Sequence, residues 1–213
     1  MTGRQVRDEM MTLFFTGHVT TALALAWTFY LLGQNPAAEE RLQREADTVL
    51  AGRTPGFQDL ARLPYLDMVF KESLRLYPPA FGVVREALND CEIGGYPIPK
   101  GATLAMFQWS VHRDPRFFDR PEEFIPERWE NDFAKILPRC AYFPFGAGPR
   151  LCIGNTFAQA EVLMILAAIV QKFHLELVRS HRVATAPSLT LRPLKGIRLT
   201  VRKRGEAAAS QTV

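Results

Sequence analysis

The sequence has little cysteine, with three residues among 213 and no spacing that suggests pairs. An odd number of unpaired cysteines excludes a disulfide-based scaffold and favours a reducing compartment. A secretory signal is also missing, because Asp8 and Glu9 follow Arg4 and Arg7 where such a signal has an apolar run. We therefore expect a cytoplasmic protein.

A strong charge of one sign is absent from most of the chain. The net charge is +4, yet residues 1–178 hold 18 basic and 21 acidic side chains, and residues 179–213 hold 8 and 1. A nucleic-acid-binding surface needs basic residues clustered with aromatic ones on a folded face. This distribution argues against a nucleic-acid partner. With 47% hydrophobic residues, the chain can form one globular domain with a hydrophobic core.

Charged side chains are absent between Glu9 and Glu39, and this run is long and apolar enough to span a membrane. Thr12, Thr16 and Thr20 recur at every fourth position in it, which makes one face of a helix polar. A helix through the middle of a large soluble protein has the same pattern. We predict such a buried helix, which argues against membrane association of this segment, and the membrane span is the alternative.

Caps, prolines and apolar periodicity predict the remaining elements. Helices are expected from a Thr2 cap to Gly33, from Pro36 to about Gly52, from Pro64 to Tyr77 and from Ile153 to Phe173. Short strands are expected at 83–85, 103–107 and 197–202, with a hairpin turning at Gly94-Gly95. Residues 108–150 are expected to be mostly irregular, and residues 205–213 to form a disordered tail.

The most informative segment is a glycine-rich loop before the last predicted helix, Phe145-Gly146-Ala147-Gly148-Pro149-Arg150-Leu151-Cys152-Ile153-Gly154. Glycines allow tight turns that bring backbone N–H groups near the Cys152 sulfur, and the helix that follows supplies the positive end of its dipole. Both effects favour the thiolate, which is the form of cysteine that binds a metal.

Potential metal ligands outside this loop include Cys91, Cys140, His18 and His112. Cys91 and Cys140 have no comparable surroundings in the sequence, and we interpret them as small buried apolar residues. His18 and His112 are alternative ligands on chemistry alone. Neither histidine has a motif around it, so both are interpreted as structural.

Two further strings carry charged residues. Glu72 and Arg75 lie three residues apart on a predicted helix and share a face, which alone usually means a weak surface pair. Downstream, Phe124-Ile125-Pro126-Glu127-Arg128-Trp129 places another arginine where an irregular segment can fold back against that helix.

Together with the cysteine segment, and in this order, these strings resemble the Glu-x-x-Arg, Pro-Glu-Arg-aromatic and haem-binding motifs of the cytochrome P-450 family. The resemblance implies a mainly α fold with small β-sheets, in which residues 1–204 form the C-terminal part of one domain. It also implies that Glu72, Arg75 and Arg128 form an internal ion network. A buried network of this kind costs desolvation, so its role is structural and serves specificity.

The same resemblance implies haem b as the cofactor, with Cys152 as the axial thiolate ligand of its iron. Arg150 and Arg85 would pair with the haem propionates, because planar guanidinium groups suit carboxylates. Phe145, followed by Gly146, would pack near the sulfur and limit water there, and dryness around a metal thiolate tunes its potential.

Within the first predicted helix, Thr16-Gly17-His18-Val19-Thr20-Thr21 resembles the oxygen-activating segment of the family. The resemblance implies that Thr16 and Gly17 occupy the positions that leave room for dioxygen and that the Thr20 hydroxyl helps deliver protons. Val19 departs from the family pattern, which usually has Asp or Glu there. The alternative is that the threonines only bond back to their own helix.

The implied function is a haem-thiolate monooxygenase that inserts one atom of dioxygen into a small apolar organic substrate, with electrons from a ferredoxin or a flavoprotein reductase. Because Val19 cannot relay protons, a peroxygenase or an isomerase-like haem enzyme is the alternative. The resemblance runs from about residue 5 to 202 but covers only the second half of a typical member. A C-terminal fragment without activity by itself is therefore the third possibility.

Overall fold

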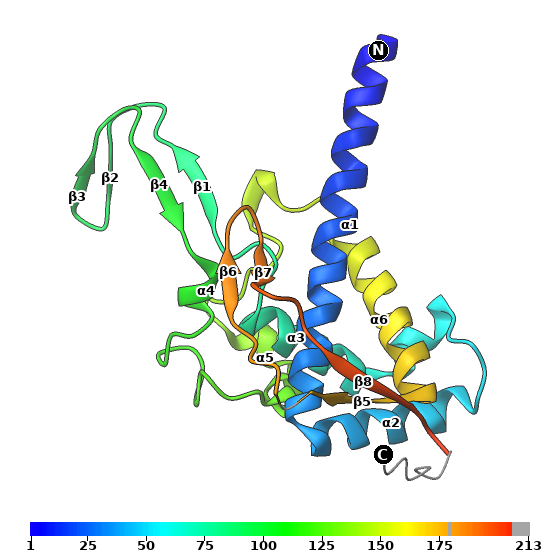
Figure 1. The fold of residues 1–213 in the computed structure, drawn as a ribbon. Helices are drawn as coiled ribbons and strands as arrows, with labels where there is room; N and C mark the ends of the chain where they lie inside the picture. The colour runs from blue at the N-terminus through cyan, green and yellow to red at the C-terminus, as the bar shows by residue number, and fades with distance from the viewer. Residues whose placement is uncertain (179, 206–213) are drawn as a thin grey trace.

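The computed structural model describes residues 1–178 and 180–205. The four long helices of this part of the chain are α1 (Gly3–Gln34), α2 (Pro36–Leu50), α3 (Pro64–Leu76) and α6 (Asn155–Lys172). Figure 1 shows α2, α3 and α6 gathered around the C-terminal half of α1. The expectation of a mainly α fold with small β-sheets is confirmed. Of the predicted tail, residues 206–213 lie outside the described residues.

Local signals set the ends of these helices. The Gln5 side chain accepts a hydrogen bond from the Thr2 backbone N–H at 2.8 Å, and the Thr2 hydroxyl accepts one from the Gln5 N–H at 3.3 Å. This capping box satisfies N–H groups that would otherwise have no partner at the start of α1. Pro36 and Pro64 occupy the first positions of α2 and α3, where a missing N–H costs nothing.

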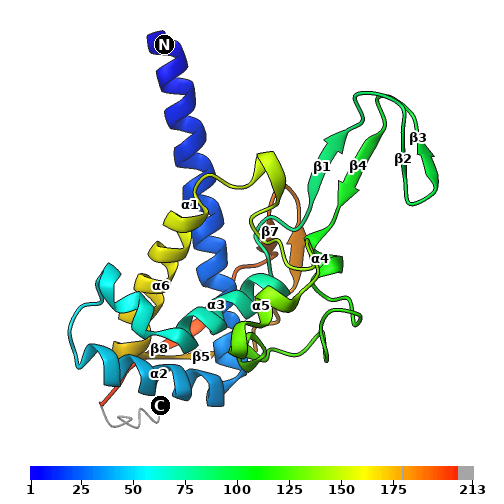
Figure 2. The same cartoon turned by 180° about the vertical axis from the view of Figure 1, so that it is seen from behind.

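The N-terminal half of α1 corrects the prediction of a buried helix. Every residue from 3 to 18 is exposed, and among the described residues none covers this half. Figures 1 and 2 show it projecting beyond the rest of the chain. The helix Gly3–Gln34 is long and apolar enough to cross a membrane by length and composition, and only 11% of its most apolar stretch is buried. Apolar composition predicted the helix, but it does not specify what covers it.

The C-terminal half of α1 behaves as predicted. Trp27 and Leu32 are fully buried, and the Trp27 indole N–H donates to the Leu191 carbonyl at 2.9 Å. The Thr28 hydroxyl meets the Ser73 hydroxyl of α3 at 2.8 Å. The core therefore sits where α1, α2, α3 and α6 converge; its most buried apolar members include Leu42, Leu50, Leu63, Leu66, Val69, Phe70, Leu166 and Ala167.

The sheets in the described residues are four antiparallel pairs: β1 (Val83–Glu86) with β4 (Thr103–Met106), β2 (Cys91–Ile93) with β3 (Tyr96–Ile98), β5 (Phe173–Leu177) with β8 (Leu199–Lys203), and β6 (Thr185–Pro187) with β7 (Leu191–Pro193). The hairpin at Gly94-Gly95 is confirmed. Strands β5, β6 and β7 were not expected; β6 and β7 have only three residues each, whereas the alternation of apolar and polar residues in β5 was a signal that the prediction missed. Cys91 and Cys140 are exposed, which corrects their assignment as buried residues, because Cys91 lies on the uncovered hairpin and Cys140 in a turn.

Short helical segments fill the long irregular region and the remaining connections: η1 (Phe57–Arg62), α4 (Gln108–Val111), η2 (Pro126–Asp132), α5 (Phe133–Ile136) and η3 (Gly148–Arg150). Segment η2 packs against α3. This contact places the Pro-Glu-Arg string beside the Glu-x-x-Arg string.

Candidate functional site

Residues 145–154, here called the cysteine loop, present a free and exposed thiol at Cys152. The Cys152 backbone N–H donates to the Phe145 carbonyl at 3.0 Å, which closes the loop on itself. Helix α6 begins three residues after the cysteine, so its N-terminal end lies close along the chain. The loop is thus a closed turn that holds one thiol at the start of a helix.

Two glycines of the loop have backbone angles that other residues adopt poorly. Gly146 has φ of 78° and Gly148 has φ of 71°, both in the left-handed region. At Gly154 a Cβ atom would lie 4.0 Å from the Cys152 sulfur, so its absence keeps the space beside the thiol open. The glycine-rich sequence therefore serves the turn and leaves room around the sulfur.

The surroundings of the loop are apolar and partly uncovered. Ile153 is 92% exposed and Phe157, on the first turn of α6, is 72% exposed. On its other side the loop faces α3 across a cleft of about 220 Å³, which Phe70, Leu74, Phe145 and Leu151 help to line. Phe145 packs partly buried against the core. Apolar side chains thus flank the thiol on the exposed face and support it from behind.

The two arginines assigned to the cofactor both lie at the surface. The Arg150 side chain makes no hydrogen bond or ion pair with any described residue, and Arg85 donates only to its neighbour, the Val84 carbonyl, at 2.8 Å. Arg85 lies on β1, and in Figures 1 and 2 the turn at η3 lies between α1 and the β1–β4 pair. Both guanidinium groups are therefore exposed and have no carboxylate partner among the described residues.

The chemical groups of these residues match those that bind haem. Haem needs a thiolate or imidazole for its iron, apolar flanks for its macrocycle and cations for its two carboxylates. The loop and the start of α6 offer the thiol of Cys152 and exposed apolar side chains such as Ile153 and Phe157, while Arg150 in the loop and Arg85 on β1 offer guanidinium groups. Among the described residues no cluster of three or more His, Cys, Asp or Glu could hold a metal ion.

The predicted oxygen-activating segment lies where α1 passes from its exposed half into the core. Thr16, Gly17 and His18 are exposed, and Thr20 is half-buried. The Thr16 hydroxyl donates to the Thr12 carbonyl at 2.7 Å, and the Thr20 hydroxyl donates to the Thr16 carbonyl at 2.6 Å. These are the back-bonds of the alternative interpretation, so the threonine hydroxyls point along their own helix here.

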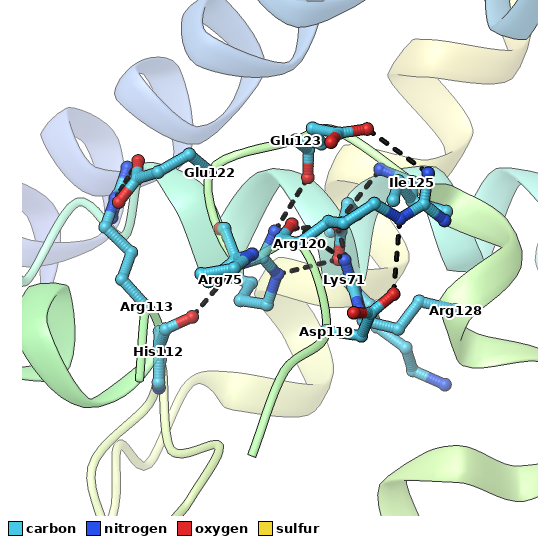
Figure 3. A network of polar contacts seen from close by, with 12 residues as sticks. Lys71, Arg75, His112, Arg113, Asp119, Arg120, Glu122, Glu123, Ile125 and Arg128 are labelled. Carbon is cyan, nitrogen blue, oxygen red and sulfur yellow. Dashed lines mark hydrogen bonds and ion pairs between the residues drawn. The ribbon is translucent and has the colours of Figure 1, made fainter. Parts of the chain in front are cut away.

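Arg75 is the centre of a buried network (Figure 3). Its side chain is 0% exposed, and all five of its N–H donors have acceptors. Two of them meet the Glu72 carboxylate at 2.8 and 2.9 Å. The other three reach the backbone carbonyls of His112, Pro121 and Glu123 at 2.9, 2.6 and 2.9 Å. The guanidinium group therefore joins α3 to three points of the irregular region.

The Glu72 carboxylate is equally well satisfied. Besides Arg75, it accepts from the Ile125 N–H at 3.0 Å, from Arg128 Nε at 3.4 Å and from the Trp129 indole N–H at 2.8 Å. A buried carboxylate is tolerated only when it is paired and hydrogen-bonded in this way. The structure thus brings Glu72, Arg75 and Arg128 together.

Sequence reasoning missed two members of this region. Trp129 closes the Glu72 side of the network, and the aromatic position of the Pro-Glu-Arg string was the signal that could have found it. Glu127 accepts from Arg41 Nη1 at 2.8 Å and from the Tyr65 hydroxyl at 3.0 Å, and Arg41 also lies 4.2 Å above the Tyr65 ring. These contacts tie η2 to α2 and α3, and nothing in the sequence marked Arg41 as the partner.

Comparisons with known proteins agree on one family. The family model described as Cytochrome P450 matches residues 1–201. "Cyclooctatin synthase" of Streptomyces melanosporofaciens is 41% identical over 199 residues, which are 92% of this chain and 43% of that protein. "Cytochrome P450 4V2" of Mus musculus is 41% identical over 204 residues, which are 94% of this chain and 39% of that protein.

A further relative and a solved structure extend this result. "Cyclooctat-9-en-7-ol 5-monooxygenase" of Streptomyces melanosporofaciens is 42% identical over 80% of this chain and 37% of that protein. A crystal structure of a cytochrome P450, CYP102L1, superposes with a TM-score of 0.87 at 32% identity and covers 96% of this chain and 46% of that one. The chain thus spans less than half the length of the curated relatives that it matches.

Proposed function

The chain belongs to the cytochrome P450 family, and we propose that residues 1–204 act as the C-terminal part of a haem-thiolate monooxygenase domain. The family and its fold imply haem b as the cofactor. The observation that carries the proposal is the exposed Cys152 thiol, held in a closed glycine loop at the start of α6 and flanked by apolar side chains. The partial coverage of longer relatives supports a role within a larger domain.

When bound, haem supplies the redox chemistry that activates oxygen, and thiolate ligation favours O–O cleavage. In this proposal Cys152 ligates the iron, Arg150 and Arg85 neutralise the propionates, and Gly146 keeps the loop in its tight turn. Phe145, partly buried against the core, supports the loop and limits water at the sulfur. The network of Glu72, Arg75 and Arg128 has a structural role.

Thr20, Thr16 and Gly17 form the oxygen-side segment of the proposed site. Gly17 has no atom within 4 Å of an added Cβ position, so the helix surface is open there. The Thr20 hydroxyl can hold a proton in reserve at Oγ1 while it bonds the Thr16 carbonyl. Delivering that proton requires the hydroxyl to turn away from its own helix.

We propose a small apolar organic compound as the substrate class, and a ferredoxin or a flavoprotein reductase as the electron donor. The apolar side chains beside the loop support the first part. A relative named for the monooxygenation of cyclooctat-9-en-7-ol, an organic alcohol, also supports it. A cytoplasmic location belongs to the same proposal.

The test is the carbon monoxide difference spectrum of the reduced chain after it is loaded with haem. A red-shifted Soret band is expected for the wild type and for Cys140→Ser, which removes another exposed thiol outside the loop. The band is expected to vanish in Cys152→Ser. An unchanged band in Cys152→Ser would refute the assignment of the ligand.

A second candidate, a peroxygenase or an isomerase-like haem enzyme, is favoured by one residue. Val19 stands on α1 next to Thr20, where it can neither relay a proton nor bind a water. Turnover with peroxide and without an electron donor favours this candidate. Faster turnover with donor and dioxygen after Val19→Asp favours the monooxygenase.

A further inference from the structure

His112 contacts both the ion network and Phe143, which lies two residues before the cysteine loop. Its side chain is fully buried, at 0% exposure. Its backbone carbonyl accepts a hydrogen bond from Arg75 Nη1 at 2.9 Å, and its ring atom Nε2 accepts one from the Phe143 backbone N–H at 2.9 Å. Figure 3 shows the carbonyl directed at the guanidinium group of Arg75. One residue therefore bonds the network with its backbone and the chain entering the loop with its side chain.

The bond to Phe143 fixes the protonation of the ring. A nitrogen that accepts an N–H cannot carry its own proton, so the neutral ring carries its proton on Nδ1, which is buried and has no hydrogen-bond partner among the described residues. Burial, followed by the nearby positive charge of Arg75, lowers the pKa of His112 to about 3. The acceptor therefore stays available throughout the neutral pH range.

From Phe143 the hydrogen bonds continue to the thiol-bearing residue. The Phe143 carbonyl accepts from the Gly146 N–H at 2.9 Å, and the Phe145 carbonyl accepts from the Cys152 N–H at 3.0 Å. A second tether lies beside the first, because the Tyr142 hydroxyl donates to the Lys71 carbonyl of α3 at 3.0 Å. The chain thus enters the cysteine loop with two consecutive residues fixed.

Packing alone does not account for the choice of residue. The His112 ring also lies against Tyr142 and Phe143, with ring centroids 5.1 and 5.4 Å apart. An apolar ring could fill that space, but it would leave the part-buried Phe143 N–H without its acceptor, which is costly. An acceptor at the position of Nε2 is therefore the property that the site requires.

We propose that His112 is a positioning residue that transmits the geometry of the buried ion network to the cysteine loop. Arg75 fixes its carbonyl, and its Nε2 fixes the amide of Phe143, from which the loop closes on Cys152. The effect on haem ligation rests on the proposed function above. The hydrogen-bonded link itself does not.

Two substitutions of nearly equal size separate the acceptor from the packing. His112→Gln places an amide oxygen at about the reach of Nε2, whereas His112→Met has the same length without a strong acceptor. In the full chain, we expect hydrogen exchange at the Phe143 amide to be about tenfold faster in His112→Met and near the wild-type rate in His112→Gln. Equal rates in the two variants would overturn the proposal.

Two further measurements keep the outcome unambiguous. Nitrogen-15 NMR of the wild type is expected to show the His112 proton on Nδ1, and a proton on Nε2 contradicts the proposal even if both variants unfold. After haem loading, the thiolate-ligated fraction is expected to fall in His112→Met and to be retained in His112→Gln. If the wild type takes up no haem, the proposed function fails, while amide exchange and NMR still decide the role of His112.

Discussion

The ion network around α3 and the exposed half of α1 both carry strings that resemble family motifs, but only the network is buried. Arg75 is 0% exposed and has all five N–H donors satisfied by residues between 72 and 123. Residues 3–18 of α1 are exposed throughout, including large apolar side chains such as Phe14 and Phe15. The network thus has its partners within the described chain, whereas the hydrogen bonds, ion pair and ring contact of residues 3–18 among the described residues all lie within α1 and its cap.

The contrast shows that a sequence motif can specify the packing partners of its residues or only their secondary structure. The network motif specifies its own environment, because its partners are backbone carbonyls and side chains a few dozen residues away. The string from Thr16 to Thr21 specifies a helix and a set of hydroxyls, and the side chains at residues 16–18 are exposed in the described chain. An exposed apolar helix face of this kind is typical of an interaction surface.

The largest expected effect comes from removing the carboxylate at the centre of the network. Glu72→Ala leaves the charge of Arg75 buried without its partner, so we expect the free energy of unfolding to fall by about 3–5 kcal/mol, measured by urea denaturation. Glu40→Ala is the matched control, because the Glu40–Arg44 pair is 69% and 66% exposed. It is expected to change stability by less than about 0.5 kcal/mol. Similar losses in both variants would remove the distinction between the two pairs.

A smaller loss is expected at the edge of the network. Trp129→Phe removes the indole N–H that donates to Glu72, and a hydrogen bond to a charged group contributes about 1.5–3 kcal/mol. Trp109→Phe is the control, since the Trp109 indole N–H donates to no described residue. Thermal unfolding is expected to show less than half the loss there. Equal losses would mean that ring size, and not the hydrogen bond, determines stability at Trp129.

The pH dependence of stability provides the next test. His112 has a pKa of about 3 in the folded chain and an ordinary value of 6.5 when unfolded, so between these values only the unfolded chain binds the proton. Stability is therefore expected to fall as the pH is lowered through this window, by up to about 1.4 kcal/mol per pH unit. His112→Gln lacks this component, and its unfolding curves from about pH 7 to about pH 4 should be flatter. Parallel curves would show that His112 is protonated in the folded state.

The smallest effect is expected on the exposed half of α1. Phe14 is 69% exposed, so Phe14→Ala is expected to change the free energy of unfolding by less than about 0.5 kcal/mol. Phe70, at 2% exposure in the core, is the matched control, and Phe70→Ala is expected to cost about 3–5 kcal/mol. A large loss on changing Phe14 would show that this half of the helix is covered in solution.

Much of the fold could be predicted from local signals. The Thr2 cap and the prolines at 36 and 64 act within one helical turn, so their effect can be read directly from the sequence. The pairing of β5 with β8 could not be predicted, because it joins residues 173–177 to residues 199–203. Strands β6 and β7 pair locally, but each has three residues and ends in a proline, which gives little local signal. The burial of α1 was predicted wrongly for residues 3–18. Apolar composition predicts a helix there, but it does not determine which residues, if any, pack against that helix.

In the candidate site, too, local features could be predicted from the sequence and long-range contacts could not. Glu72 and Arg75 are visible as a spacing on one helix, and Cys152 is visible in its glycine-rich string. The bond from Trp129 to Glu72 spans 57 residues and the bond from Phe143 to His112 spans 31, and no spacing predicts either. Long-range hydrogen bonds of this kind are determined by how the irregular region folds, which the sequence left open.

The most direct test of the contrast is hydrogen exchange across the whole chain, read by peptide. We predict slow exchange in α3, where the amides are buried under the ion network, and fast exchange in residues 3–18, because an uncovered helical segment opens at little cost in free energy. Equal protection of the two regions, or faster exchange in α3, would contradict this account, in which other described residues cover α3 but not residues 3–18.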